Sequence, residues 1–246
     1  MKRVLILGAS SGIAKSLAYE LARNNINLLL AGRNLNDLES MCSDIKLRYQ
    51  VEVNTCLFQA LDYKSHQSFF DECLNMAGDL DTVFLAYGYL GEQKTAEQDF
   101  NEASKIIDTN FTSAVSILNI IANYFEQKEN GLICVLSSVA GDRGRQSNYI
   151  YGSAKGALSL YLQGLRNRLH KSGVNVTTIK PGFVDTKMTY GTLKDSPLVA
   201  SPEQIAKAIY SAMLKKKDTA YVLWFWKWIM FIIVSIPERI FKKLSL

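Results

Sequence analysis

The sequence contains little histidine, cysteine or proline. Its two histidines, His66 and His170, stand far apart, and its four cysteines have no spacing typical of a metal site. We therefore expect no metal centre and no disulfide framework, which favours a reducing cytoplasm. Four prolines in 246 residues, without a low-complexity stretch or a solenoid-length repeat, argue against linkers and repeat arrays. The first predicted strand starts at residue 3, so we expect no signal peptide.

Apolar residues make up 48% of the chain and charged residues 21%, which suits one α/β domain with a large core. Strand-like and helix-like stretches alternate, as is typical of a parallel sheet. The predicted strands are 3–7, 27–31, 51–56, 82–86, 132–137, 174–179 and 220–224. The predicted helices are 12–24, 34–49, 64–77, 99–127, 149–171 and 202–216. We expect one doubly wound Rossmann-type domain, residues 1–224, with a seven-stranded parallel sheet, followed by a hydrophobic, basic helical extension, residues 225–246.

A glycine-containing turn follows the first predicted strand. Gly8 and Gly12 let the backbone turn sharply and approach a pyrophosphate, which the positive end of the next helix would stabilise. The residues expected to contact a dinucleotide here are Gly8, Ser10, Ser11, Gly12 and Ile13. On its own, such a turn is equally compatible with an ordinary tight connection between a strand and a helix.

Arg33 follows the second predicted strand, residues 27–31, and lies 25 residues after Gly8. Sites that prefer NAD place an acidic residue near this offset to bind the ribose hydroxyls, whereas an arginine suits a 2′-phosphate. The alternative is a solvated surface arginine. Together with the glycine turn, Arg33 predicts NADP(H) as the cofactor.

Ser138, Tyr151 and Lys155 form a second pattern. Ser138 follows an apolar run and so lies where a parallel strand ends, which is where doubly wound sheets bind ligands. Tyr151 and Lys155 are four residues apart and share one face of a helix. We expect the ammonium of Lys155 to lower the pKa of the Tyr151 phenol, and Ser138 to hydrogen-bond a substrate oxygen. Each residue alone is commonplace, but the three behind a dinucleotide turn indicate hydride transfer between a carbonyl and an alcohol.

These motifs resemble the short-chain dehydrogenase/reductase superfamily over residues 1 to about 224. The similar stretches are Gly8–Ala14, Leu61-Asp62, Asn110, Ser138, Tyr151–Lys155 and Pro181–Thr186. The resemblance implies that Asn110 holds a water linking Lys155 to solvent, and that Asp62 meets the adenine. It also implies cofactor contacts at Ala86, Gly88, Tyr151, Lys155, Pro181, Gly182, Val184 and Thr186, with Lys155 holding the nicotinamide ribose. The chain departs from the pattern at Leu7, where threonine is usual, and at Ala86-Tyr87-Gly88, where Asn-Ala-Gly is usual. Neither departure touches the catalytic residues Asn110, Ser138, Tyr151 and Lys155.

Two further expectations concern the surroundings of this site. Residues 187–201 are predicted to be a substrate lid, although an ordinary surface loop fits as well. The long helices 99–127 and 149–171 resemble those through which the superfamily forms homodimers and homotetramers, so we expect one of these assemblies.

The C-terminus is both the most hydrophobic and the most basic part of the chain. Residues 215–246 carry seven Lys/Arg and two acidic residues, a net charge of +5, which equals that of the whole protein. All three tryptophans lie within residues 224–228. The 17 residues 220–236 would reach only about 26 Å as a helix, less than a bilayer core of about 30 Å. We therefore favour a helix lying on the inner face of the cell membrane, over an oligomer interface or a transmembrane anchor. Nucleic acid fits poorly, because bulky aliphatic residues interrupt the basic ones.

The stretch 85–93 and this C-terminus resemble a bacterial branch that includes the reductase of decaprenylphosphoryl 2-keto-pentose. The sequence thus predicts an NADPH-dependent carbonyl reductase acting on a lipid-linked keto-sugar or another membrane-associated substrate. A reductase of 3-oxoacyl thioesters, a reductase of steroid-like or long-chain ketones, and a non-catalytic NADP-binding protein are the alternatives.

Overall fold

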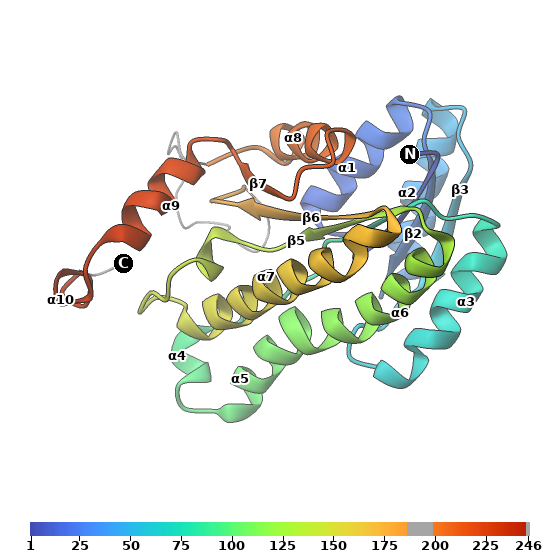
Figure 1. Ribbon diagram of the computed structural model, residues 1–246. Helices are drawn as coiled ribbons and strands as arrows, with labels where there is room; N and C mark the ends of the chain where they lie inside the picture. Colours follow the sequence, from blue (N-terminus) through green and yellow to red (C-terminus); the bar gives the residue numbers. More distant parts are fainter. Residues whose placement is uncertain (186–198, 245–246) are drawn as a thin grey trace.

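A single seven-stranded sheet organises the protein, whose computed structural model describes residues 1–185 and 199–244 (Figure 1). All neighbouring strands are parallel, and their order is β3-β2-β1-β4-β5-β6-β7. The strands are β1 (Arg3–Leu7), β2 (Asn27–Gly32), β3 (Val53–Leu57), β4 (Thr82–Leu85), β5 (Gly131–Leu136), β6 (Val174–Pro181) and β7 (Thr219–Val222). The predicted doubly wound, seven-stranded parallel sheet is therefore confirmed.

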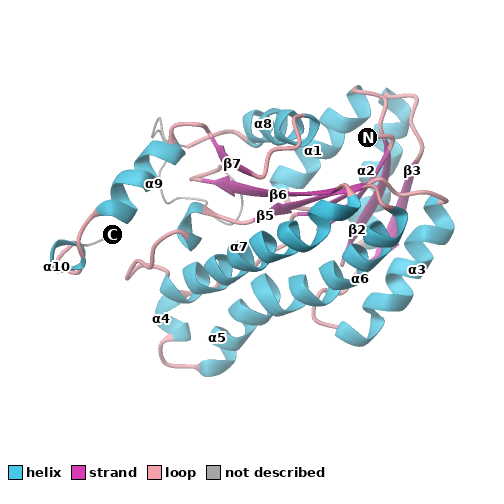
Figure 2. Cartoon of the chain, viewed as in Figure 1, coloured by secondary structure: helices cyan, strands magenta, loops and turns pink. Residues whose placement is uncertain are grey.

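Helices cover both faces of the sheet (Figure 2). One face packs against α1 (Gly12–Arg23), α2 (Leu35–Arg48) and α8 (Pro202–Leu214). The other packs against α3 (His66–Ala77), α6 (Ser113–Lys128) and α7 (Tyr149–Leu169). Strand side chains alternate between the two cores, with Val4 and Ile6 in one and Leu5 and Leu7 in the other, all fully buried. The near-continuous apolar strands of the sequence follow from this two-sided burial.

The predicted helix 99–127 is interrupted in the structure. It consists of α5 (Phe100–Ile107), a wide helical turn at Asp108–Thr112 and α6. Within the turn, the side chain of Asn110 donates a hydrogen bond to the Ile106 carbonyl at 2.8 Å. The Asn110 side chain thus occupies a carbonyl of the preceding helical turn, and periodicity alone gives no sign of such a bulge. The prediction of one uninterrupted helix was wrong at this point.

The short helix α4 (Gln93–Ala96) was not predicted, and it begins where the Glu92 carboxylate accepts from the Lys94 and Thr95 amides. The last strand is shorter than predicted, because β7 ends at Val222 and Trp224 lies exposed beyond it. Two helices follow, α9 (Trp226–Ser235) and α10 (Glu238–Phe241), and they extend away from the β7 edge of the sheet (Figure 1). Within the described part of the chain, no helix is both long and apolar enough to cross a bilayer.

The strand order places the functional site. The chain first builds outward from β1 to β3 and then returns to the other side of β1 with β4, so the order reverses between β1 and β4. Parallel sheets open a crevice at the carboxyl ends of the strands beside such a reversal. Residues that follow β1, β4, β5 and β6 therefore converge at one edge of the sheet.

Candidate active site

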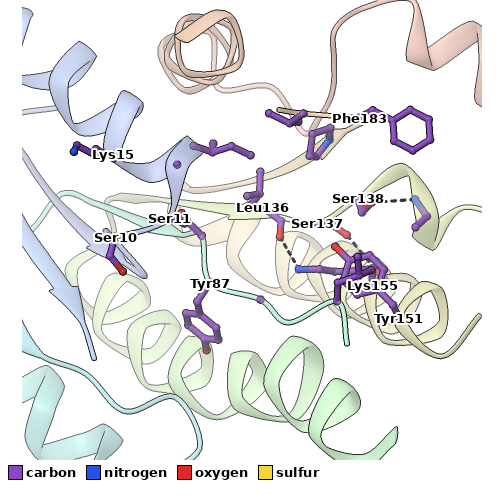
Figure 3. Close-up of a pocket in the computed structure, with 18 of the residues that line it drawn as sticks. Ser10, Ser11, Lys15, Tyr87, Leu136, Ser137, Ser138, Tyr151, Lys155 and Phe183 are labelled. Atoms are coloured by element: carbon purple, nitrogen blue, oxygen red, sulfur yellow. Dashed lines mark hydrogen bonds between the residues drawn. The ribbon is translucent and has the colours of Figure 1, made fainter. Parts of the chain in front are cut away.

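A cavity of about 1340 Å³ lies at this edge of the sheet. It brings together twelve of the predicted residues, namely Ser10, Ser11, Gly12, Ile13, Ala86, Gly88, Ser138, Tyr151, Lys155, Pro181, Gly182 and Val184. Figure 3 shows Ser10 and Ser11 on one side of the pocket, and Ser138 and Tyr151 on the other. Gly8, Arg33, Asp62 and Asn110 do not line the cavity itself, and Thr186 and most of the predicted lid lie outside the described residues.

The turn after β1 requires glycine at position 8. Gly8 has φ +83°, and a Cβ on it would lie 2.7 Å from the Cβ of Tyr87. The amides of Gly8 and Ala9 both donate to the Ala31 carbonyl, which fixes the turn to the end of β2. Ser11 then caps α1 by accepting from the Ala14 amide. The first amides of α1 thus open onto the cavity, an arrangement that suits a phosphate group.

Arg33 and Lys15 supply positive charge near this turn. Arg33 is exposed directly after β2, two residues beyond the carbonyl that holds the turn. Lys15, in the first turn of α1, lines the cavity and was missed by sequence reasoning. The sequence signal for Lys15 is its spacing, because it follows Ser11, the N-cap of α1, by one helical turn. Asp62 is exposed at the start of a single 3-10 turn, Tyr63–Ser65.

Close backbone approaches hold Ser138, the predicted catalytic serine, against α7. Ser138 begins a short 3-10 turn, Val139–Gly141, and its hydroxyl accepts from the Ala140 amide at 3.1 Å. A Cβ on Gly141 would lie 2.6 Å from the Gly156 amide nitrogen, so only glycine permits this contact. Tyr151 and Lys155 lie on the same stretch of α7 that receives this turn. The three predicted catalytic side chains are thereby brought to one place.

Burial sets the charge state of the two titratable groups. The Lys155 ammonium is 3% exposed and donates to the Leu136 carbonyl at 3.1 Å. Burial lowers the pKa of Lys155 to about 8. Burial also raises the pKa of Tyr151 to about 12, which a hydrogen bond with Ser138 offsets in part. The expected lowering of the Tyr151 pKa by Lys155 is thus not found, because desolvation dominates and the ammonium is directed at the strand carbonyl.

Asn110 faces the same space as Lys155. Its amide donates to the Tyr89 carbonyl at 2.5 Å and accepts from the Tyr89 amide at 3.2 Å, which ties the segment after β4 to the helical bulge. A Cβ on Gly88 would lie 2.8 Å from Asn110 Oδ1 and 3.4 Å from Lys155 Nζ. Only glycine at position 88 therefore lets the Asn110 and Lys155 side chains pack this closely against the segment after β4. Gly88 and Lys155 line the same cavity as the turn after β1, an arrangement that suits a nicotinamide dinucleotide.

The C-terminal segment, residues 223–244, begins beside the active-site cavity. Trp226 is 4% exposed and Met230 is 1% exposed, and both belong to one buried cluster with Val139, the residue that directly follows Ser138. A Cβ on Gly182 would lie 1.8 Å from the Trp226 ring, so this cavity residue is glycine because the indole lies on it. One face of α9 thus belongs to the wall around the active site.

Arg143 attaches the rest of the segment. Its guanidinium donates to the carbonyls of Ile233, Val234 and Ile236, at 3.2, 2.8 and 2.7 Å. It also forms an ion pair with Glu238 at 2.9 Å and stacks 3.9 Å from the centre of the Phe241 ring. Carbonyls at the end of a helix lack intrahelical partners, so one arginine satisfies the end of α9 and holds α10. The sequence signal is weak, because 90 residues separate the partners.

The opposite face of α9 is apolar and exposed. Its large side chains are Trp228 at 59%, Phe231 at 65% and Ile232 at 63% exposure, with Trp224 at 73% beside them. Lys227 lies 6.0 Å from the centre of the Trp228 ring, and Arg239, Lys242 and Lys243 are exposed in and after α10. A helix that is apolar on both faces is normally covered on both faces. The outward face therefore lacks a partner among the described residues.

Among those residues there is also no group of three or more histidine, cysteine, aspartate or glutamate side chains arranged to hold a metal ion.

Comparison with known proteins places the chain in a family. The short chain dehydrogenase family matches residues 2–196. An uncharacterised oxidoreductase of Mycobacterium tuberculosis is 32% identical over 241 residues, 98% of this chain and 96% of that protein. An NADP-dependent 3-hydroxy acid dehydrogenase of Schizosaccharomyces pombe is 27% identical over 229 residues, 88% of each protein. The structure of a short-chain dehydrogenase from Sphingobium yanoikuyae in complex with NADPH superposes with a TM-score of 0.82, 21% identity and 97% coverage of both chains. The chain therefore belongs to the short chain dehydrogenase family.

Proposed function

We propose that this protein is an NADPH-dependent carbonyl reductase that works at a membrane surface, on a lipid-linked keto-sugar or another hydrophobic ketone. The observation that carries the reaction is the convergence of Ser138, Tyr151 and Lys155 in the cavity that also receives the glycine turn. A non-catalytic binding protein would have no need for these side chains in this arrangement.

The protonation states support reduction. With a pKa raised to about 12, Tyr151 keeps its proton near neutral pH. A protonated phenol is the form required to donate a proton to the oxygen of a ketone as negative charge develops there. The Ser138 hydroxyl hydrogen-bonds that oxygen and orients it. NADPH, when bound, supplies the hydride to the carbonyl carbon. The hydride and the phenol proton together convert the ketone to an alcohol.

Lys155 and Asn110 support this proton transfer. With a pKa lowered to about 8, Lys155 exchanges a proton near neutral pH more readily than an exposed lysine. Asn110 faces the same space from the helical bulge and holds the segment after β4 in place. We propose that a water on Asn110 connects Lys155 to solvent, so that the proton lost by Tyr151 is replaced.

The choice of NADPH rests on Arg33. This residue lies beside the turn that would hold the pyrophosphate, and Lys15 adds a second positive charge from α1. An exposed arginine and lysine suit a 2′-phosphate, whereas an NAD site would favour an acidic residue here. The NADPH complex of the Sphingobium protein and the NADP dependence of the yeast relative support this choice.

The outward face of α9 is the proposed membrane contact. Its exposed tryptophans and phenylalanine would enter the headgroup region, and the exposed lysines and arginine of the C-terminal segment would face anionic headgroups. A ten-residue helix is about 15 Å long, which suits lying on a bilayer rather than crossing it. Because the other face of α9 packs beside Val139 and Gly182, this orientation brings the mouth of the active site near the membrane. A homodimer or homotetramer stays a prediction, with exposed Leu160 on α7 as a candidate contact.

A 3-oxoacyl thioester reductase is the main competing function, since it needs the same catalytic residues. The test is NADPH oxidation by the full chain in lipid micelles, offered a polyprenylphosphoryl 2-keto-pentose or a 3-oxoacyl thioester. We expect turnover of the sugar lipid. Turnover of the thioester alone would make this a fatty-acid-type reductase, and NADPH oxidation with neither ketone would contradict the lipid-linked keto-sugar as the substrate.

A further inference from the structure

Arg145 lies in the wall of the active-site cavity without a partner. It belongs to the segment between the Ser138 turn and α7, and it lines the cavity together with Ser138 and Tyr151. Its Nε atom is buried and has no hydrogen-bond partner, and no ion pair with Arg145 occurs within the described part of the chain. Its neighbour Arg143, by contrast, has every side of its guanidinium engaged. Arg145 is thus placed for binding rather than for holding the fold together.

The acidic groups around Arg145 are already engaged. Asp142 forms an ion pair with Lys180 and accepts from the Tyr221 hydroxyl. The Glu92 carboxylate, which also lines the cavity, caps α4. Asp37 and Asp44 lie on α2, beside the nucleotide end of the cavity. Asp142 acts on Arg145 only through space, and burial lowers the pKa of the Arg145 guanidinium despite it. A partly buried guanidinium without a hydrogen-bonded anion is costly, so the charge of Arg145 is available to a ligand.

The start of α7 adds a second unpartnered polar group. Asn148 occupies the N-cap of this 21-residue helix, yet its side chain makes no capping hydrogen bond. Its Oδ1 atom is buried without a partner and also faces the cavity wall. The end of α7 that carries Asn148 is the positive end of the helix dipole. Two polar side chains, three residues apart, are therefore left unsatisfied next to the catalytic tyrosine.

We propose that Arg145 binds an oxyanion of the substrate, a phosphate or a carboxylate attached close to the ketone, and that Asn148 Oδ1 accepts from a substrate hydroxyl. This assignment rests on the proposed carbonyl reductase activity and narrows its substrate class. The cofactor phosphates are not competitors, because the turn after β1 that suits them lies across the pocket from Ser138 and Tyr151 (Figure 3). A guanidinium fits either oxyanion with two parallel hydrogen bonds.

The test uses pairs of ketones in which one member carries an oxyanion and the other is its uncharged counterpart. Hydroxyacetone phosphate is compared with hydroxyacetone, and acetoacetate with its methyl ester, using full-length wild type, Arg145→Met and Arg145→Lys. We expect Arg145→Met to lower kcat/KM for the charged member about 10- to 100-fold, mainly through KM. The neutral member should change less than about twofold, and Arg145→Lys should recover part of the loss. The phosphate and carboxylate pairs distinguish the two oxyanions.

Binding is measured separately from turnover. Calorimetry on protein saturated with NADP⁺, which cannot reduce a ketone, should show the charged members binding more tightly than the neutral ones in wild type. Arg145→Met should abolish this preference, while Arg168→Met, which removes one exposed arginine paired with Glu126, should keep it.

Equal binding of charged and neutral ketones by the wild type would overturn the assignment of Arg145, even if both were reduced. Equal losses for both members of a pair in Arg145→Met would overturn it as well. Failure of the wild type to oxidise NADPH with any ketone would count against the reductase activity instead, and the calorimetric preference would still decide the anion site.

Discussion

Two regions differ in the groups that they bury: the residues around Ser138, Tyr151 and Lys155, called the catalytic floor, and the C-terminal segment, residues 223–244. On the floor, around Ser138, Tyr151 and Lys155, polar groups are buried and nearly all have fixed partners. In the C-terminal segment, residues 223–244, apolar groups are exposed and only one face of α9 is covered. In the proposed function, the first arrangement positions protons and a reacting oxygen, and the second positions the whole protein against a membrane surface. The proposal therefore assigns chemistry and location to separate side chains.

The two regions nevertheless meet at one short stretch of chain. Val139 shares a buried cluster with Trp226, and Arg143 holds the end of α9. Five residues after Ser138, the chain is thus already engaged with the C-terminal segment. If the comparison is right, substitutions on the floor should affect turnover without membrane binding, and substitutions on the outward face of α9 should do the reverse.

The largest expected effect is that of Tyr151→Phe. It removes the proton donor while keeping the ring, so we expect kcat to fall roughly 10³-fold. NADPH affinity and vesicle binding should stay at wild-type values, as measured by fluorescence titration and flotation. Turnover within about tenfold of wild type would place the acid elsewhere.

Lys155→Met tests the cost of the buried charge. Between a folded pKa of about 8 and an unfolded pKa of 10.5, the charged form is disfavoured by about 3 kcal/mol. That pKa shift is already a net effect, the bond to Leu136 included, so we expect the variant to be up to about 3 kcal/mol more stable than cofactor-free wild type below pH 8, although it is inactive. Because wild-type Lys155 becomes neutral above that pH, the difference should disappear between pH 8 and 10.5.

Denaturant unfolding across this pH range measures the difference. Exposed Lys171→Met serves as the control and should show no such pH dependence. A variant that is less stable than wild type at pH 7 would mean that the Lys155 charge is well compensated in the fold.

The double variant Trp228→Glu, Phe231→Glu tests whether the outward face of α9 binds the membrane. Removing two large side chains from the bilayer should weaken partitioning into anionic vesicles about 100-fold, since each contributes about 1.5 kcal/mol or more. Turnover of a water-soluble ketone should be unchanged. Leu47→Glu is the matched control, because Leu47 is 86% exposed on α2 and far from this face in the fold.

Retained vesicle binding by the double variant would remove the proposed membrane face. Loss of a dimer or tetramer in the same variant would instead show that a second copy covers this face of α9.

The smallest expected effect is that of Arg33→Asp. Losing one charge-assisted contact to a 2′-phosphate and gaining an acceptor for ribose hydroxyls should shift the NADPH-to-NADH preference about tenfold or more toward NADH. The ratio of kcat/KM for the two cofactors measures it. An unchanged ratio would leave Lys15 as the phosphate contact.

Local patterns predicted the framework of this protein and most of its site. The apolar runs of the strands, the glycine turn and the Tyr151–Lys155 spacing are short-range signals, and the sheet order brought them together as expected. The bonds of Asn110 to Tyr89 and of Arg143 to α9 join residues distant in sequence, and the Arg145 Nε lacks a hydrogen-bond partner among the described residues, so short-range patterns give no sign of them. The pKa of Tyr151 was predicted in the wrong direction, because burial is a property of the fold and not of the Tyr-Lys spacing.

The most direct test of the central claim is the fate of the hydride. The full-length protein is incubated with NADPH deuterated at the transferable C4 position and a ketone of each proposed class, and the product is examined by mass spectrometry. The account predicts one deuterium on the new carbinol carbon for each NADPH consumed. Oxidation of NADPH without deuterium in an alcohol would contradict it.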